Sequence, residues 1–301
     1  MKRQLLIAGG TGLIGSVLQE AAIAEGWEVT ILSRHEGPSH IKWNPQDGHI
    51  SLSTSRKFDA IVNLAGTSIA GSRWTQERKE EIVSSRVKAS QTLEGYIQKG
   101  LLETNIYVGA SGIGIYGDSG NMQVDEFTSI PASDDWMINT VLQWEASHKR
   151  IAQLGIRTII LRTGIVLSSN GGALREIMRT SPFGVLGYFG NGRQIWPWIH
   201  IEDHVRIILH SINMDSMEGI YLAASPHPVS DKELTLALNK QYSPRRLVLP
   251  VPGIFLALLL GEMRSVLFQS CNAYPTRLLK EGFQFRYPTI LEALQNLVKK
   301  K

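Results

Sequence analysis

Short apolar runs alternate with amphipathic stretches along the chain. The first run, from Gln4 to Ala8, is followed by a glycine-punctuated turn and by helical spacing of apolar residues over 12–25. After Gly26 a second apolar run covers residues 27–32. Two apolar runs separated by an amphipathic helix predict a β-α-β unit, whose strands are parallel and buried.

The same alternation continues to the end of the chain. Residues 41–55 interrupt it, since they are polar and carry turn signals at Pro45 and Asp47-Gly48; we expect a loop with at most a short edge strand. Further strands are predicted at 58–66, 105–111, 156–162 and 219–224, and helices at 76–98, 135–154, about 174–178, 231–241, 253–260, 275–281 and 289–299. The predicted fold class is therefore α/β, a Rossmann-type doubly wound parallel sheet with a smaller, mostly helical C-terminal lobe.

The turn after the first strand has glycines at positions 9, 12 and 15. This spacing is a variant of the dinucleotide fingerprint with one extra residue between the first two glycines. Gly9 would allow the tight turn, Gly12 would let the backbone approach a pyrophosphate, and Gly15 would let the helix lie close to the sheet. The phosphates would then meet unpaired N–H groups at the start of helix 12–25. The spacing alone also fits a purely structural turn.

The end of the second strand predicts which nicotinamide cofactor binds. An NAD enzyme commonly carries an acid about 20 residues after the glycines, where it accepts hydrogen bonds from the ribose 2′-hydroxyl. This chain has Ser33-Arg34 there, and an arginine pairs with a 2′-phosphate, which indicates NADP(H). The alternative is a solvated arginine at a strand end, and Glu36 lies nearby in the sequence.

A third strand end completes the predicted cofactor site. Strand 58–66 finishes in Asn63-Leu64-Ala65-Gly66, where the chain should pass over the cofactor. The predicted cofactor-binding residues are Gly9, Thr11, Gly12, Leu13, Ile14, Gly15, Ser33, Arg34, Asn63, Leu64, Ala65 and Gly66. Residues 1–167 would form the NAD(P)-binding domain, which also receives 195–225; residues 168–250 would supply the substrate side, and 251–301 a small helical C-terminal domain.

Composition narrows the classes of partner. The chain has 301 residues, 43% apolar and 19% charged, as expected of a globular protein with a full-size core. Its net charge of +4 is scattered apart from a terminal lysine run, which argues against a nucleic-acid partner. The single Cys271 excludes a disulfide framework, and no His/Cys cluster predicts a metal.

The sequence also predicts a compartment. It opens directly on a strand, without a signal peptide, and the apolar stretch 253–260 is too short to span a bilayer. We therefore expect a cytoplasmic protein without a membrane partner, and a homodimer is left open.

Motifs along almost the whole chain resemble one known group. The pattern strand-GGTGLIG, strand-SR, strand-NLAG, strand-AS-x4-YG resembles the extended short-chain dehydrogenases/reductases. In more detail the chain is similar to their atypical branch of sugar-nucleotide epimerases, whose C-terminal segment is a separate small domain. The closer match is carried by residues 63–66, 73–75, 85–86, 161–167, 171–174, 198–203, 259–263 and 282–288. The resemblance implies NAD(P) binding and oxidoreductase or epimerase chemistry.

The chain departs from that superfamily at its catalytic helix. The resemblance implies a tyrosine on helix 135–154 with a lysine four residues later, on the same helix face. This helix contains no tyrosine, and none of the eight tyrosines in the chain has a lysine at that spacing. Ser111 matches the superfamily serine that hydrogen-bonds the reacting oxygen, and Tyr116 lies in the Tyr-Gly turn that follows. Ser111 and Tyr116 are therefore the candidate catalytic residues.

Four later residues each have two interpretations. His200 and Asp203 fit a catalytic role, or a structural role at the start of the next helix, where acids stabilise the dipole. Trp196 and Trp198 fit stacking on a substrate ring, or packing in the core.

Two functions remain. One is an NADP(H)-dependent oxidoreductase or epimerase that acts on a small polar or nucleotide-linked substrate. The other is a catalytically silent NADP(H)-binding scaffold or redox-responsive regulator, which the missing tyrosine and lysine favour.

Overall fold

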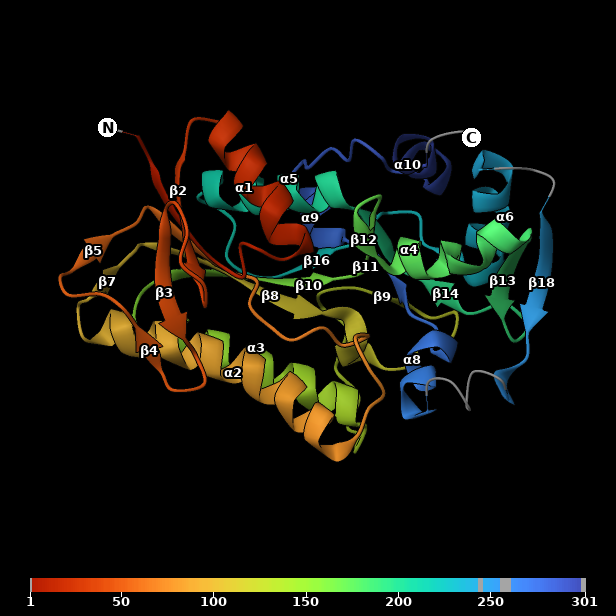
Figure 1. Cartoon of the computed structure of the whole chain (residues 1–301), viewed down its shortest axis with the longest axis horizontal. Coiled ribbons are helices and arrows are strands. Elements are labelled where there is room, and N and C mark those ends of the chain that lie inside the picture. Colours follow the sequence, from red (N-terminus) through yellow and green to blue (C-terminus); the bar gives the residue numbers. More distant parts are fainter. Residues whose placement is uncertain (1, 243–245, 255–260, 299–301) are drawn as a thin grey trace.

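The centre of the molecule is a twisted sheet (Figure 1). This computed structural model describes residues 2–242, 246–254 and 261–298, and within them eight strands pair in the order β16-β10-β8-β6-β1-β2-β3-β4. All are parallel except β4. The strands are β1 (Gln4–Ala8), β2 (Glu28–Ser33), β3 (His40–Asn44), β4 (His49–Ile50), β6 (Ala60–Asn63), β8 (Ile106–Gly112), β10 (Arg157–Thr163) and β16 (Gly219–Ala223). The predicted Rossmann-type sheet is confirmed.

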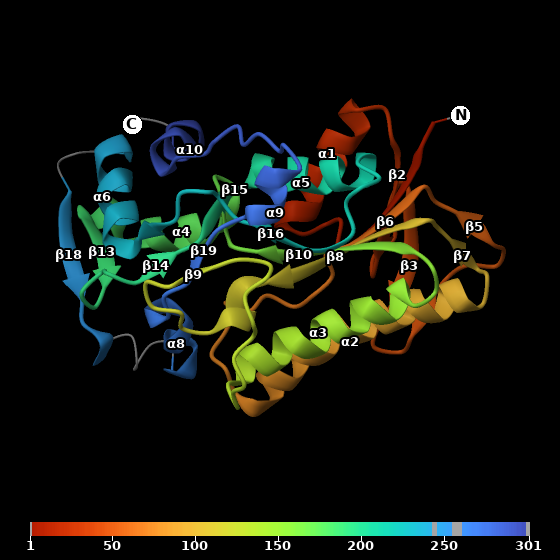
Figure 2. The ribbon, with the colours of Figure 1, turned by 180° about the vertical axis from the view of Figure 1, so that it is seen from behind.

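Helices cover both faces of this sheet (Figures 1 and 2). Helices α1 (Leu13–Ala24) and α5 (Ile201–Asn213) lie on one face, and α2 (Gln76–Gln98) and α3 (Trp136–Ala152) on the other. Side chains alternate along β1, so that Ile7 joins the core under α1 and α5 while Leu6 joins the core under α2 and α3. Burial on both faces explains why this strand is apolar throughout.

The direction of chain travel reverses between β1 and β6. From β1 the chain builds β2 and β3 on one side, then crosses over and builds β6, β8, β10 and β16 on the other. The connections leaving the carboxyl ends of β1 and β6 therefore run to opposite faces. In open α/β sheets this point is the crevice where ligands bind.

A second lobe lies beyond the carboxyl ends of β8 and β10 (Figure 1). It contains β11 (Ile165–Ser168), β12 (Gly171–Gly172), α4 (Ala173–Ile177), η2 (Met178–Phe183), β13 (Val185–Phe189), β14 (Ile195–Trp196), β15 (Trp198–His200), β17 (Val229–Ser230), α6 (Asp231–Tyr242), β18 (Leu247–Val251), η3 (Gly261–Met263), α8 (Arg264–Phe268) and α10 (Ile290–Leu297). A separate apolar core holds it together, with Leu174, Leu186, Trp198 and Leu238 at its centre.

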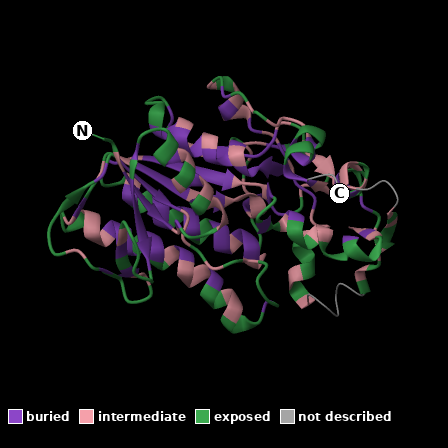
Figure 3. Cartoon of the chain, turned by 45° about the horizontal axis from the view of Figure 1, so that its top comes forward, coloured by how far each residue is buried: buried purple, intermediate pink, exposed green. Residues whose placement is uncertain are grey.

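The C-terminal segment contributes to both lobes. Strand β19 (Asn272–Ala273) pairs with β9 (Gln123–Val124), and Leu278 of α9 (Thr276–Lys280) enters the core under α1 and α5. Further along, α10 buries Leu294 in the second lobe. The remaining short elements are β5 (Arg56–Lys57), β7 (Leu102–Glu103) and η1 (Ile113–Tyr116). In Figure 3 the buried residues concentrate in the sheet and on the helix sides that face it. The domain boundary at residue 251 stays a prediction.

Two expectations about strands need correction. Residues 40–44 form β3, a full neighbour of β2, where a loop with at most a short edge strand was expected. Its alternating Ile41 and Trp43 point into the core, whereas the intervening Lys42 is exposed. The second lobe also contains the parallel pair β13–β18, where the sequence predicted no strand. The helix predicted at 253–260 falls mainly outside the described residues.

Candidate functional site

The three glycines of the first turn have different surroundings. Gly9 has a φ of +81°, and a Cβ there would lie 2.8 Å from the backbone carbon of Leu64. A Cβ on Gly15 would overlap the carbonyl oxygen of Gly9, so the close approach of α1 to the turn requires glycine. At Gly12 φ is −79°, and the nearest atom to a Cβ is the Gly9 oxygen at 3.3 Å. Gly9 and Gly15 are therefore required by the close backbone packing of the turn. The space above Gly12 is open and could be occupied by a ligand.

Helix α1 begins at this turn without a side-chain cap. Gly12 is its N-cap residue, and its first turn contains no acidic side chain. The positive end of the helix dipole is therefore free to meet an anion. Thr11 and Gly12 are exposed there, and Leu13 reaches across to Gly172 of the second lobe.

The predicted residues after β2 lie at the same edge of the sheet. The Ser33 hydroxyl is buried and accepts the N–H of His35 at 3.0 Å, which fixes the turn. Arg34 is exposed and forms no ion pair within 4.0 Å in the described chain, although its charge adds to the hydrogen bond from Arg78 in lowering the pKa of Glu81. Its guanidinium is therefore available to a phosphate.

The segment after β6 crosses the carboxyl end of β1. The Leu64 N–H donates to the Ala8 oxygen at 2.9 Å, which holds the segment against the neighbouring strand. Asn63 is buried below it: its amide donates to Tyr107 at 2.9 Å, and its oxygen accepts the N–H of Ala65 at 3.1 Å. Asn63 thus supports the loop from inside, and the backbone of Leu64 and Ala65 lies against Gly9 of the first turn.

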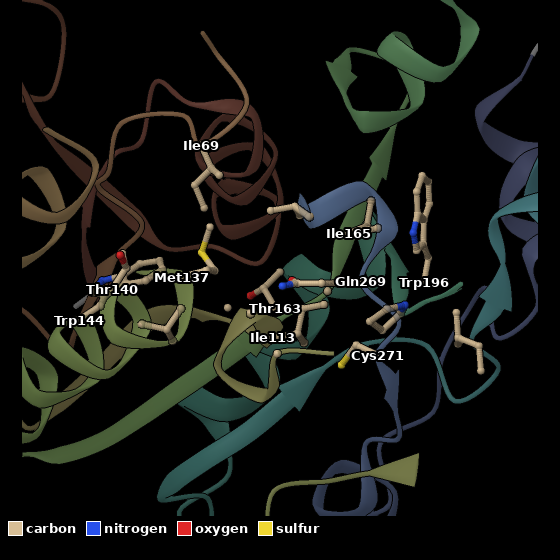
Figure 4. Close-up of a pocket in the computed structure, with 18 of the residues that line it drawn as sticks. Ile69, Ile113, Met137, Thr140, Trp144, Thr163, Ile165, Trp196, Gln269 and Cys271 are labelled. Atoms are coloured by element: carbon tan, nitrogen blue, oxygen red, sulfur yellow. The ribbon is translucent and has the colours of Figure 1, made fainter. Parts of the chain in front are cut away.

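A cavity of about 180 Å³ opens beside the carboxyl ends of β8 and β10 (Figure 4). Its walls come from α2, α3, the segment after β10, and residues 195–197 and 266–271 of the second lobe. The lining residues central to its chemistry are Arg86, Met137, Thr140, Val141, Trp144, Thr163, Trp196 and Cys271. The walls are mainly apolar, as in most small-molecule sites.

Helix α3 presents an apolar face to this cavity. Met137 and Val141, four residues apart, line the cavity. Trp144 lines it as well, and Figure 4 shows Met137 and Trp144. Thr140 also lines it, but its hydroxyl donates to the Trp136 oxygen at 2.7 Å. Neither a tyrosine nor a lysine appears among the described residues that line the cavity, so the departure noted from the sequence is a feature of the site itself.

Among the described residues that line the cavity, Arg86 and Cys271 are titratable. Burial raises the pKa of the Cys271 thiol to about 12, so it stays protonated at neutral pH. Burial lowers the pKa of Arg86 to about 10, and the charge of Arg78 adds to that effect. Arg86 therefore remains a cation at neutral pH, inside the protein.

The candidate catalytic residues Ser111 and Tyr116 do not line this cavity. The Ser111 hydroxyl donates to Glu145 at 2.8 Å, and Arg162 forms a two-pronged ion pair with the same carboxylate at 2.8 and 3.0 Å. Arg162 also donates to the Tyr116 oxygen at 2.7 Å, and that hydroxyl donates to the Asp125 carbonyl. Both residues, expected at the reacting centre, instead belong to a buried network behind the cavity wall. A catalytic role for either stays a prediction that this orientation does not favour.

Burial shapes the titration of that network. Burial alone would lower the pKa of Arg162, but the hydrogen bonds and charge of Glu145 outweigh it and raise that pKa. For Tyr116, burial raises the pKa of the phenol to about 12, although the charge of Arg162 opposes the shift. Tyr116 is therefore a poor proton donor at neutral pH.

His200 and Asp203 take the structural role. His200 accepts the N–H of Glu202 at the start of α5, and its other ring nitrogen bonds to Asn296 of α10 at 3.1 Å. Asp203 accepts the backbone N–H groups of Arg286 and Tyr287, each at 2.8 Å. The two residues thus attach the C-terminal segment to α5.

The two tryptophans of the adjacent segment differ. Trp198 is fully buried and donates to the His227 carbonyl at 3.0 Å, which is core packing. Trp196 lines the cavity, as Figure 4 shows.

Arg86 was the residue that sequence reasoning missed. It appeared only as part of the Ser85-Arg86 match, without a role. A signal existed: positions 82, 86, 89 and 93 share one helical face, and Ile82, Ala89 and Leu93 are apolar and buried. An arginine within an apolar stripe is a buried charge and therefore a candidate for function.

The fold and the glycine turn at the reversal point define the class of dinucleotide-binding α/β proteins. A model of the NAD-dependent epimerase/dehydratase family matches residues 5–223, and a model described as a domain of unknown function (DUF1731) matches residues 251–297. The chain therefore belongs to the NAD-dependent epimerase/dehydratase family, and the resemblance seen in the sequence is confirmed.

Relatives match the sequence of this chain over almost its full length. The chain is 31% identical to the human epimerase family protein SDR39U1 over 299 residues, with 98% of this chain and 99% of that protein covered. It is 32% identical to the epimerase family protein YfhF of Bacillus subtilis over 302 residues, with 98% and 97% covered.

Solved structures of epimerase family proteins also match this chain. The crystal structure of human SDR39U1 with NADPH matches with a TM-score of 0.88 and 30% identity, covering 98% of each chain. A nucleoside-diphosphate sugar epimerase from Corynebacterium glutamicum matches with a TM-score of 0.79 and 26% identity, covering 99% of this chain and 58% of that one. Over the described residues of our chain, every helix is too short or too polar to cross a membrane. The cellular compartment stays a prediction.

Proposed function

We propose that this chain is an NADP(H)-dependent oxidoreductase or epimerase of the extended short-chain dehydrogenase/reductase type, acting on a small molecule. The observation that carries the proposal is the relation between two places at one edge of the sheet. The open turn at Gly12 lies at the β1/β6 reversal point, and the apolar cavity lies at the carboxyl ends of β8 and β10, the next two strands beyond β6 along the same edge.

The residues at the crevice fit a dinucleotide. The uncapped start of α1 suits the pyrophosphate, and the exposed Arg34 suits a ribose 2′-phosphate. The backbone of Leu64 and Ala65 lies against the turn at Gly9. When bound, a nicotinamide cofactor supplies or accepts the hydride. The task left to the chain is to hold the reacting carbon near the apolar cavity and to keep water out. The human relative solved with NADPH supports the choice of cofactor.

Calorimetry with NADPH and NADH tests this assignment. In Arg34→Ala we expect NADPH affinity to fall roughly 10- to 100-fold, because a charge-assisted pair with the 2′-phosphate is lost. NADH has no such phosphate, so its affinity should stay nearly unchanged. Arg56→Ala, at another exposed arginine, is the matched control. An equal loss for both cofactors in Arg34→Ala contradicts the NADP assignment.

One observation favours the alternative, a catalytically silent NADP(H)-binding scaffold. Among the described cavity-lining residues the titratable groups are Arg86 and Cys271, and neither exchanges a proton readily at neutral pH. Steady NADPH consumption measured over aldehydes, ketones and nucleotide sugars separates the two functions. Turnover of any member supports the enzyme, and tight NADPH binding with no turnover across the panel supports the scaffold.

A further inference from the structure

The cavity contains a buried positive charge that the fold does not neutralise. Arg86 is 6% exposed, and no carboxylate within 4.0 Å pairs with it in residues 2–242, 246–254 or 261–298. Its Nη1 donates to the carbonyl oxygens of Thr67 and Ile82, each at 2.9 Å. Neutral carbonyls satisfy N–H groups but do not supply a counter-charge, and an uncompensated buried charge is costly.

One edge of the same guanidinium is unused. The buried Nε has no hydrogen-bond partner within the described chain, and Nη2 makes no hydrogen bond there either. Nε and Nη2 are neighbours on a planar fork, and two parallel N–H groups at that spacing match the two oxygens of a carboxylate. The free edge is therefore shaped for an acid group.

The surroundings favour an anion with an apolar body. The Trp144 ring lies 4.8 Å from the Arg86 guanidinium carbon, and Trp196 lies across the cavity from Trp144 (Figure 4). The indole N–H of Trp196 is buried and also lacks a partner among the described residues, so it is a second unused donor beside the cavity. Every lining residue is neutral or positive, since the lining contains no acidic side chain in the described chain.

The volume indicates the size of the group that the cavity can surround. At about 180 Å³ the cavity is close to the roughly 150 Å³ that holds a benzene molecule in an engineered protein core. A molecule of about ten non-hydrogen atoms fits such a space, whereas a nucleotide sugar is several times larger.

We propose that the cavity binds a small carboxylic acid with an apolar body, held by the Nε and Nη2 edge of Arg86. This inference rests on the proposed function and names the substrate class of the same site. Nε is screened from solvent in the free protein, so the proposal requires the guanidinium to turn toward the cavity when the acid binds. Arg86 then acts as the residue that selects acids over neutral molecules of the same shape.

Paired probes test the selection. Benzoate is compared with benzamide, and 4-methylpentanoate with its amide, by calorimetry on the full chain with and without NADPH. We expect at least one acid to bind tenfold or more tightly than its amide in the wild type. Arg86→Met should reduce that ratio to within threefold, and Arg86→Lys, which keeps the charge but not the fork, should fall between them. Arg150→Met, at an arginine on the outer side of α3, is the control and should keep the wild-type ratio.

Melting temperatures of all variants accompany the titrations, because removing an unpaired buried cation should leave stability unchanged or raise it. Acid and amide binding alike, neither binding at millimolar concentration, or an unchanged ratio in Arg86→Met would overturn the inference and leave NADPH binding standing. An equal loss of NADPH affinity in Arg86→Met would also overturn it, since the arginine would then belong to the cofactor. A wild type that selects acids but does not bind NADPH would instead reject the proposed function.

Discussion

Two buried arginines lie near the same cavity and differ in what surrounds them. Arg162 is 2% exposed, and its guanidinium meets both oxygens of Glu145 and the hydroxyl of Tyr116. Arg86 is nearly as buried, yet it meets two neutral carbonyls and leaves one edge unused. The two arginines have the same charge and similar burial, but they differ in how many of their N–H groups are hydrogen-bonded.

The contrast separates structural from functional polar groups. The network of Ser111, Glu145, Arg162 and Tyr116 is saturated from within, so it ties β8, α3 and β10 together and has little capacity for a ligand. A buried polar group without a hydrogen-bond partner destabilises the fold, so its presence in a native structure needs an explanation. We infer that the unpaired N–H groups of Arg86 indicate the ligand site better than the residue types of Ser111 and Tyr116 do.

The largest expected effect is a loss of stability when the network around Arg162 is broken. Glu145→Ala would leave Arg162 buried without its partner, which should lower the free energy of unfolding by about 3–5 kcal/mol. Urea denaturation measures it. The double variant Glu145→Leu/Arg162→Met removes both charges and should recover most of the loss. A Glu145→Ala protein as stable as the wild type would mean that the network does not support the fold.

Gly15 and Gly12 allow the same comparison for the backbone, because Gly15 is closely packed and Gly12 faces open space. Gly15→Val should destabilise the protein strongly, because its side chain would overlap the Gly9 carbonyl. Gly12→Val should keep the fold and lose NADPH affinity at least 100-fold, since its side chain would fill the space above the turn. Circular dichroism and cofactor titration distinguish these results. Wild-type NADPH affinity in Gly12→Val would show that the turn is only structural.

Asp231 extends the comparison to a buried acid that forms no ion pair with any residue that the structure describes. It accepts the N–H groups of Phe189 and Gln194, and burial raises its pKa to about 6, from 3.8 in an unfolded chain. The native carboxyl keeps its proton to higher pH than the unfolded one, so its contribution is present below pH 4 and is lost as pH rises through about 6. We expect a loss on the order of 2 kcal/mol over that range.

Unfolding free energies of the wild type and Asp231→Asn, measured from pH 4 to 7, test this expectation. The difference between the two proteins should change over that interval and level off above it. A difference that does not vary with pH would show that Asp231 titrates as it does in the unfolded chain.

The smallest expected effect concerns Ser111. Ser111→Ala removes one donor from Glu145, whose oxygens keep the two bonds from Arg162, so stability should fall by about 1–2 kcal/mol. NADPH affinity should not change. If a substrate is found and turnover also falls tenfold or more at unchanged NADPH affinity, then Ser111 acts on the reacting oxygen and the saturated network is not purely structural.

Much of the fold followed from local pattern. The run from Gln4 to Ala8, the glycine turn and the segment ending in Asn63 each carry a period or a turn signal that neighbours in sequence are enough to reveal. Strand β3 was predicted as no more than a short edge strand, because turn residues surround its short alternation of Ile41 and Trp43. Strands β13 and β18 were missed because they lie 58 or more residues apart and pair only through the tertiary fold.

The site was harder to predict than the fold. Positions that lie at strand ends, such as Ser33 and Arg34, could be placed from the order of the elements. The direction of a side chain could not: Ser111 faces Glu145, 34 positions away, and nothing near it in the sequence indicates that partner. The missing counter-charge of Arg86 is likewise a property of the assembled walls of the cavity.

The C-terminal segment has a consequence for biosynthesis. Leu278 and Phe283 complete the core beneath β1, and Ile290 and Leu294 complete that of the second lobe. These residues are synthesised after both lobes that they finish. A nascent chain that stops before residue 272 would therefore expose two apolar surfaces at once, and it would depend on chaperones until the last segment arrives.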